Sequence, residues 1–232
     1  MCGRFAQTQS GEAIAEAFQL SAVPELVPRY NIAPSQGISV VTQSRKTGDR
    51  DHHEKKWGLI PRWSKDSKIG QKLINARSET AAEKPSFRNA FQKRRCLIVT
   101  DGFYEWQKIE GRTKQPYLIR LKSRSPFAFA GLWERWQNPQ SEEEVFSCTI
   151  LTTAANDAMT SIHHRMPVIL APEAYDTWLD TTFYNPGVMQ DLLGPFDASA
   201  IETTPISNAV NNPRNDSASV QEPVELASAL DT

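Results

Sequence analysis

The sequence has few cysteines and no long apolar run. Its three cysteines, Cys2, Cys96 and Cys148, lie far apart and outside any C-x-x-C spacing. This pattern argues against a disulfide framework and gives no indication of a metal site. Cys96 and Cys148 fall in strand-like runs, where we expect them to be inert core residues. No apolar stretch approaches the ~18 residues that a membrane-spanning helix needs, so we expect no membrane association.

The segment Met1–Phe5 also lacks the apolar core and the cleavage site of a signal peptide. We therefore expect a cytoplasmic protein. Glycine is scarcer than proline, 11 residues against 15, which indicates many rigid connections and few long helices. Nothing in the composition demands a cofactor or an oligomer, so we expect a monomer that works without a cofactor.

Positive charge is concentrated in one part of the chain, although the whole protein has a net charge of −1. Residues 55–95 contain 12 Lys/Arg and three acidic residues, a net charge of +9, so the remainder carries −10. This asymmetry favours a basic face for a polyanion such as nucleic acid. A lysine-rich solvated surface would give the same composition, and charge alone does not separate the two.

Apolar periodicity predicts the secondary structure. Residues 9–20 favour a helix with Ser10 as N-cap, because Ile14, Ala17 and Phe18 share a face. Further short helices are expected at residues 78–83, 155–161 and 172–179. Strands are expected at residues 38–41, 56–60, 96–99, 117–121, 127–133, 146–153 and 168–170.

Short spacings between these strands favour an α+β fold, with a mixed, mostly antiparallel β-sheet or barrel-like core and flanking helices. No repeat or clear linker divides the chain, so residues 1–212 are expected to form a single domain. The polar residues 213–232 are expected to form a tail that is disordered in part or loosely docked. The polar stretch 44–53 predicts a turn that places His52 and His53 on the surface.

Cys2 becomes the N-terminal residue if Met1 is removed, as methionine aminopeptidase does when residue 2 is small. An N-terminal cysteine carries an amine of unperturbed pKa ~7.7–8.0 and a thiol of ~8.5, so both are partly deprotonated at neutral pH. Such a 1,2-aminothiol condenses with an aldehyde: the amine forms an imine, and the thiolate closes a five-membered thiazolidine ring. The alternative is a cysteine that stands at position 2 by chance.

Two further segments carry acid–base groups. Glu105 lies between Tyr104 and Trp106 and is expected at a strand end or turn, where its carboxylate could exchange protons with a substrate. His163 and His164 precede a predicted strand, and only one of them can face a given site if the backbone is extended. Histidine exchanges protons near neutral pH. A surface glutamate and a structural histidine are the alternatives.

The basic region contains side chains suited to nucleic acid. Asn75 can hydrogen-bond a sugar, and Arg77 can bind a phosphate through two donors. Trp57, Trp63 and Phe87 lie among the cations, an arrangement typical of single-strand binding by base stacking. Aromatic residues that belong to the core are the alternative.

These segments together resemble the SOS response-associated peptidase (SRAP) family of abasic-site processing proteins. The resemblance covers residues 1 to about 212, and its motifs are specific because six of them occur in order. They are Met1–Phe5, Arg29–Pro34, Trp57–Pro61, Asn75–Thr80, Asp101–Trp106 and Ile162–Pro167.

The resemblance implies a role for each site residue. Cys2 forms the thiazolidine with a ring-opened abasic deoxyribose, and Asn75 contacts the sugar. Glu105 and His163, rather than His164, are the acid–base residues.

The resemblance also implies DNA contacts. Arg4 and Arg77 bind phosphates, Pro34 lies in a segment that wedges against the DNA, and Trp63 lies near the bound strand. Phe87 of the basic region joins them as a predicted stacking residue. The family often has two adjacent tryptophans at Trp63, where this sequence has a single one.

The function implied is that of a sensor and shield of abasic sites in single-stranded DNA, within the SOS response and at the nucleoid. It would form a covalent protein–DNA crosslink through Cys2 and have weak lyase activity. Two alternatives stay open. Cys2 could be the nucleophile of a thiol autopeptidase with His163 as base, or the protein could be a noncatalytic single-strand binding module.

Overall fold

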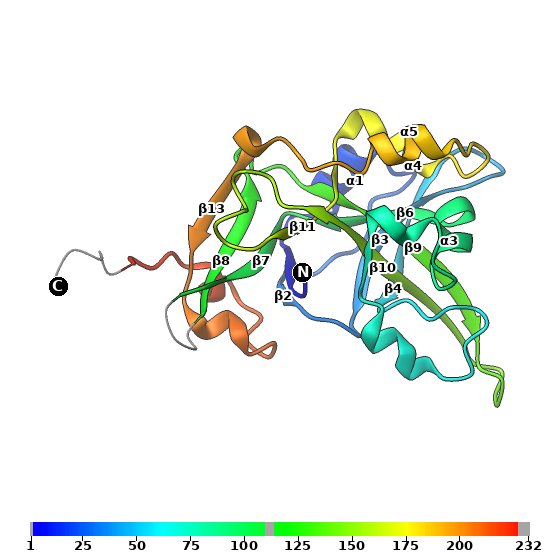
Figure 1. Cartoon of the computed structure of the whole chain (residues 1–232), viewed down its shortest axis with the longest axis horizontal. Helices are drawn as coiled ribbons and strands as arrows, with labels where there is room; N and C mark the ends of the chain where they lie inside the picture. Colours follow the sequence, from blue (N-terminus) through cyan, green and yellow to red (C-terminus); the bar gives the residue numbers. More distant parts are fainter. Residues whose placement is uncertain (1, 110–113, 227–232) are drawn as a thin grey trace.

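Two β-sheets and a layer of short helices make up the fold (Figure 1). The structure, a computed structural model, describes residues 2–109 and 114–226. Met1 and the last six residues of the predicted tail lie outside the described residues. The mostly antiparallel α+β architecture with a barrel-like core confirms the predicted fold class.

Five strands of the larger sheet close into a barrel. The order β10-β4-β3-β6-β9 closes because β10 pairs with both β4 and β9. The pairing of β4 with β10 is parallel, and the other four pairings are antiparallel. The barrel strands are β3 (Gly37–Gln43), β4 (Arg50–Trp57), β6 (Arg95–Thr100), β9 (Phe127–Gln137) and β10 (Glu144–Ala154). Three short strands extend this sheet: β5 (Asn75–Arg77), β11 (Arg165–Pro167) and β12 (Ile169–Leu170).

A second, antiparallel sheet covers the barrel. Its strand order is β13 (Ile201–Pro205), β8 (Lys114–Leu121), β7 (Gly102–Lys108), β1 (Phe5–Gln7) and β2 (Arg29–Ile32). Phe5 of β1 packs edge-on against Trp57 and Phe129 of the barrel, with ring centroids 5.1 and 5.9 Å apart. We call the apolar residues between the second sheet and the barrel interior the inner layer; it includes Cys2, Phe5, Trp57, Cys96, Ile98, Phe103, Phe129, Cys148 and Ile150.

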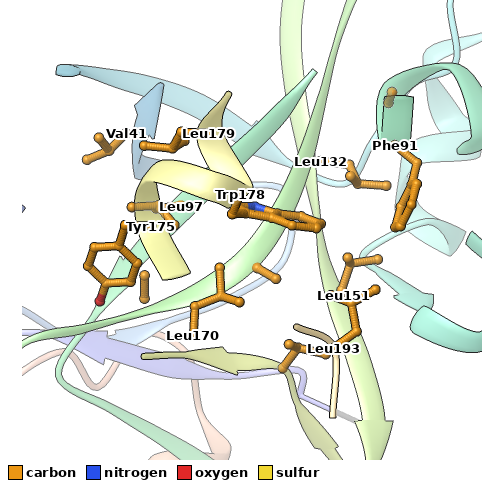
Figure 2. Packing of buried hydrophobic residues seen from close by; sticks show 14 of the residues in the cluster. Val41, Phe91, Leu97, Leu132, Leu151, Leu170, Tyr175, Trp178, Leu179 and Leu193 are labelled. Atoms are coloured by element: carbon orange, nitrogen blue, oxygen red, sulfur yellow. The ribbon is translucent and has the colours of Figure 1, made fainter. Parts of the chain in front are cut away.

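The helices cover the outer face of the barrel. They are α1 (Gly11–Phe18), α3 (Arg88–Lys93), α4 (Tyr175–Leu179) and α5 (Pro186–Asp191), with the short α2 (Ser78–Ala81) beside β5. Figure 2 shows Trp178 and Tyr175 of α4 packed over aliphatic side chains of the strands. We call this the outer layer; it includes Val41, Phe91, Leu97, Leu132, Leu151, Leu170, Tyr175, Trp178, Leu179 and Leu193. Single 3₁₀ turns lie at Ser67–Lys72, Pro172–Ala174, Ala198–Ala200, Asn208–Asn211 and Ala218–Gln221.

Most predicted strands and helices are confirmed, and some details are wrong. Helix α1 begins after Ser10, whose hydroxyl accepts from the Ala13 amide, but Ala17 is exposed. Residues 155–161 form turns instead of a helix. His52 and His53 lie in β4, because β4 begins at Arg50 and the turn after β3 is shorter than expected.

The polar segment that follows residue 212 contacts the second sheet as far as Val224, whose amide donates to the Pro205 carbonyl at 3.0 Å. Val220 is buried, and Asp216 accepts hydrogen bonds from the amides of Tyr30 and Asn31. Polar contacts therefore hold this part of the predicted tail against the second sheet. Among the residues that the structure describes, no helix is long and apolar enough to cross a membrane.

Candidate active site

Cys2 lies where the two sheets meet. It precedes β1 and is fully buried. Its carbonyl oxygen accepts a hydrogen bond of 2.6 Å from Nδ2 of Asn75, which belongs to β5. Its Sγ lies 3.9 Å from the carbonyl oxygen of Arg4. Cys2 is thus fixed from one sheet through Asn75 and from the other through Arg4.

The surroundings of Cys2 favour the protonated thiol. Burial raises the pKa of the Cys2 thiol, and the nearby charge of Glu105 raises it further. A reaction at this sulfur therefore requires a neighbouring group that removes the proton.

Glu105 lies within β7 rather than at its end, and it is 3% exposed. Neighbouring residues of a strand point to opposite faces. Tyr104 belongs to an apolar cluster on the outer face of the second sheet, with Trp106 packed against it. The predicted packing of Glu105 between these two rings is therefore wrong. The carboxylate instead lies near Cys2 and His163, as its influence on both pKa values shows.

His163 lies in the turn that precedes β11, with its ring stacked on His164 at 4.4 Å. Nδ1 of His163 lies 3.0 Å from the Arg165 amide nitrogen and 3.1 Å from the Arg165 carbonyl oxygen, so the backbone of Arg165 holds the ring at this nitrogen. Burial lowers the pKa of His163, Glu105 raises it, and His164 lowers it. The ring is therefore neutral at pH 7 and able to accept a proton.

Arg165 ties this turn to the segment that carries Asn75. Its guanidinium binds both carboxylate oxygens of Glu79 in α2, at 2.5 and 3.0 Å. Since α2 directly follows β5, the ion pair connects the backbone near His163 to the backbone near Asn75. The ordered matches at Asn75–Thr80 and Ile162–Pro167 therefore come together in space.

The two predicted phosphate-binding arginines differ. Arg77 is exposed at the start of α2. Arg4 is half-buried, and its Nη1 donates to Asn31 Oδ1 at 2.8 Å and to the Val210 carbonyl at 2.9 Å. Burial lowers the pKa of Arg4. One guanidinium nitrogen of Arg4 is thus already engaged within the protein.

The predicted aromatic and wedge residues also separate. Trp63 is 60% exposed, beside a cavity of about 290 Å³ that Pro61, Pro85 and other residues line. Pro34 is half-exposed in the turn after β2. Trp57 is buried in the inner layer and Phe87 in the outer layer. The predicted base stacking by these two rings is therefore wrong.

The basic region is largely a surface. Lys55 and Arg95 are buried, and Arg94 pairs with Glu134 at 2.7 Å. The nine exposed basic residues are Lys56, Arg62, Lys65, Lys68, Lys72, Arg77, Lys84, Arg88 and Lys93. Within residues 2–109 and 114–226 no group of three His, Cys, Asp or Glu side chains could hold a metal ion.

Sequence reasoning missed the contacts of Asn31. This side chain is fully buried, and its Nδ2 donates to the carbonyls of Val210, Asn212 and Asn215. Asn31 stood in a recognised motif without an assigned role. The available signal was the density of asparagine and aspartate between residues 208 and 216, since such side chains satisfy backbone groups in turns.

Comparison with known proteins agrees with this arrangement. The profile of the SOS response associated peptidase (SRAP) family matches residues 1–213. Abasic site processing protein YoqW of Bacillus subtilis is 45% identical over 221 residues, covering 94% of this chain and 97% of that protein. Abasic site processing protein YedK of Escherichia coli is 33% identical over 235 residues, covering 97% and 100%. A crystal structure from Bacteroides thetaiotaomicron matches 97% of this chain and 100% of its own, with a TM-score of 0.85 at 27% identity. The chain belongs to the SOS response associated peptidase family.

Proposed function

We propose that this protein captures abasic sites in single-stranded DNA by forming a covalent thiazolidine through Cys2 once Met1 has been removed. The observation that carries the proposal is the convergence of Cys2, Asn75, Glu105 and His163 at the junction of the two sheets. The names of YoqW and YedK as abasic site processing proteins support the substrate.

The chemistry needs an aldehyde, which the ring-opened abasic sugar supplies at C1′. The Cys2 amine attacks C1′ and water leaves, which gives an imine. The Cys2 sulfur then adds to the imine carbon, its proton passes to the nitrogen, and the ring closes. One water is released overall. Glu105 and the neutral ring of His163 are suited to move the protons of ring opening and dehydration.

Asn75 positions the reactants in this scheme. Its Nδ2 fixes the Cys2 carbonyl, while its Oδ1 is buried and has no hydrogen-bond partner among the described residues. A buried amide oxygen without a partner is costly, so a sugar hydroxyl that donates to it would be favoured. Holding the sugar against Cys2 in this way lowers the entropic barrier to attack.

DNA would reach the site along the exposed basic residues, with Arg77 at the end of β5 and Trp63 as a stacking surface. Binding through phosphates predicts an affinity that falls as salt rises. The same imine could also undergo β-elimination, which would appear as a weak lyase activity that cleaves the strand. A functional location at the nucleoid follows from the same substrate.

Intact mass spectrometry of the mature protein with abasic single-stranded DNA tests the proposal. We expect a denaturant-resistant species whose mass is the sum of the two reactants less one water. A protein with Met1 retained, or with an added N-terminal tag, should give none because the Cys2 amine is blocked. No adduct from the mature wild-type protein would refute covalent capture.

Two variants separate this chemistry from its alternatives. Cys2→Ala should bind DNA without forming the thiazolidine. Cys2→Ser keeps the amine and should give only a reversible imine, which borohydride would trap. A peptidase that uses the thiol alone would instead stay active with the amine blocked. A noncatalytic binding module would form no covalent species in any variant.

A further inference from the structure

The segment from Asn208 to Gln221 is built around one buried side chain. Asn31 Nδ2 donates to the carbonyls of Val210, Asn212 and Asn215 at 3.1, 3.1 and 2.8 Å. One amide group thus gathers three carbonyls of a chain that has little apolar surface of its own. We call residues 208–221 the C-terminal clasp.

Asp216 secures the clasp on the other side of β2. Its carboxylate accepts from the amides of Tyr30 and Asn31 at 2.5 and 2.8 Å, and from Arg29 Nε at 2.8 Å. Hydrogen bonding and the Arg29 charge lower the pKa of Asp216 against its burial. The carboxylate therefore stays charged at neutral pH and keeps these contacts.

Arg4 connects the clasp to the segment before β1 that contains Cys2. Arg4 Nη1 donates to Asn31 Oδ1 and to the Val210 carbonyl, so its side chain is bound to the clasp and to Asn31 at once. The Arg4 carbonyl accepts from the Tyr104 amide at 3.0 Å and lies 3.9 Å from Cys2 Sγ. Arg4 thereby connects the clasp to the nucleophile.

The clasp also holds both neighbours of Glu105. Gln221 Nε2 donates to the Tyr104 hydroxyl at 2.9 Å, and that hydroxyl donates to the Tyr30 carbonyl at 2.5 Å. Trp106 Nε1 donates to Asn211 Oδ1 at 2.7 Å. The backbone on each side of Glu105 is therefore tied to the same segment as Arg4.

We propose that the C-terminal clasp is part of the active site, with Asn31 and Asp216 as positioning residues that hold Cys2 and Glu105 in register. The proposal rests on the proposed function of Cys2 as the nucleophile. It extends the functional unit beyond residue 213, where the family profile ends. It also gives Arg4 a positioning role beside the phosphate binding that the resemblance implies.

Two substitutions of Asp216 in the full-length mature protein test this assignment. Asp216→Ala removes the acceptors of both amides, whereas Asp216→Asn can keep Oδ1 toward them and loses the charge and the acceptor that face Arg29 Nε. Crosslinking is followed as a function of DNA concentration, which separates the maximal rate from the Kd. Small displacements of reacting groups cost rate steeply, so we expect Asp216→Ala to lower the maximal rate about tenfold. We expect its Kd to stay within about twofold and Asp216→Asn to restore the rate.

Glu202→Ala is the matched control. Glu202 lies in β13 of the same sheet and pairs with Arg124 at 2.8 Å, and neither residue belongs to the clasp. It should leave the rate unchanged. An unchanged rate in Asp216→Ala, an equal loss in Glu202→Ala, or a loss that appears only in Kd would each overturn the positioning role. If Asp216→Ala does not fold, Gln221→Leu, which removes the contact to the Tyr104 hydroxyl, takes its place.

Formaldehyde keeps the test independent of DNA. This small aldehyde condenses with the Cys2 aminothiol, and intact mass reports the rate. Asp216→Ala should slow this reaction while Asp216→Asn should not, even if wild-type protein gave no adduct with abasic DNA. The absence of an adduct between wild-type protein and abasic DNA would refute the capture of abasic DNA. It would leave the proposed role of the clasp intact. Equal formaldehyde rates in all three proteins would refute the clasp.

Discussion

The inner and outer layers lie against opposite faces of the same barrel strands, yet they are built from different side chains. The inner layer combines aromatic rings with three thiols and meets the second sheet, and Cys2 lies at that junction. The outer layer is mainly aliphatic and is covered by helices. The proposed reacting groups stand on or beside extended strands, while the helices contribute stability and no predicted catalytic residue.

Even within the inner layer the three cysteines differ. Cys96 and Cys148 lie inside the barrel, where burial raises the pKa of Cys96 to about 12 and the pKa of Cys148 also well above its usual range. A Cβ at Gly131 would lie 2.8 Å from Cys96 Sγ, so no space is left for a reagent there. Of the three cysteines, only Cys2 has its pKa raised by Glu105, and the same carboxylate raises the pKa of His163. Burial alone therefore does not decide which thiol reacts.

Substitution of His163 should have the largest effect on the junction. His163→Asn removes the proposed proton acceptor and should lower the maximal crosslinking rate by about 10²–10⁴-fold. The Kd for DNA should change little. His164→Asn is the control, because His164 is exposed and only stacks on His163. Equal losses in the two variants would contradict the assignment.

The pH dependence of the wild-type crosslinking rate also tests the role of His163. Burial opposes the charged ring, so the pKa of His163 lies below its usual ~6.5. The ring then stays neutral as pH falls to 6.5 and becomes charged only below it. We expect the acid limb of the rate to lie below pH 6.5 and to be lost in His163→Asn. A limb centred above 6.5 would contradict a neutral, desolvated His163.

The strands of both layers could be read from the sequence where they are long and apolar. The runs at 96–99 and 127–133 are buried on both faces and stand out in composition. The three-residue β1 and β5 carry no alternation long enough to detect, although both hold site residues in place. Glu105 was recognised, but its face depended on the register of β7 against β1 and β8, which only the folded sheet sets.

The proposed nucleophile and acid–base residues could be named from the sequence, whereas the residues that support them could not. Asn31 and Asp216 act through backbone carbonyls and amides more than 175 residues away in the chain. Such contacts leave no periodic pattern in the sequence. The expected turn at 44–53 was wrong for a related reason, because the pairing of β4 with β3 overrode the polar composition of this segment. The expected helix at 155–161 was wrong as well.

Substitution of Arg95 should affect the outer layer alone. This buried guanidinium donates to five carbonyls at the ends of α3 and α4 and in the loop after α4: those of Phe91, Gln92, Trp178, Asp180 and Phe183. Arg95→Met would leave these carbonyls without a donor and should lower the free energy of unfolding by about 3–5 kcal/mol. Urea unfolding measures the loss as a lower midpoint at unchanged slope.

The same variant tests whether the two layers are separable. Arg95→Lys should recover part of the stability, because an ammonium group supplies three donors where the guanidinium supplied five. The crosslinking rate of the folded Arg95→Met protein should equal that of wild type below the unfolding transition. If Arg95→Met lowered the crosslinking rate in native conditions without lowering the stability, the outer layer would control the junction. The inner and outer layers would then not be separable.

Substitution of Trp63 should give the smallest effect, and one confined to binding. Trp63 is 60% exposed and belongs to neither layer, so its removal should not alter the free energy of unfolding measurably. Base stacking on an aromatic ring contributes about 1–3 kcal/mol, so Trp63→Ala should raise the Kd for single-stranded DNA by about tenfold. Trp63→Phe should retain most of the affinity. Phe183→Ala is the control: this exposed ring lines a separate cleft of about 660 Å³ that holds none of the predicted site residues. The Kd of Phe183→Ala should match that of wild type. An equal rise of the Kd in both variants would mean that exposed aromatic rings anywhere on the surface bind DNA. Trp63 would then have no particular role in guiding the strand to Cys2.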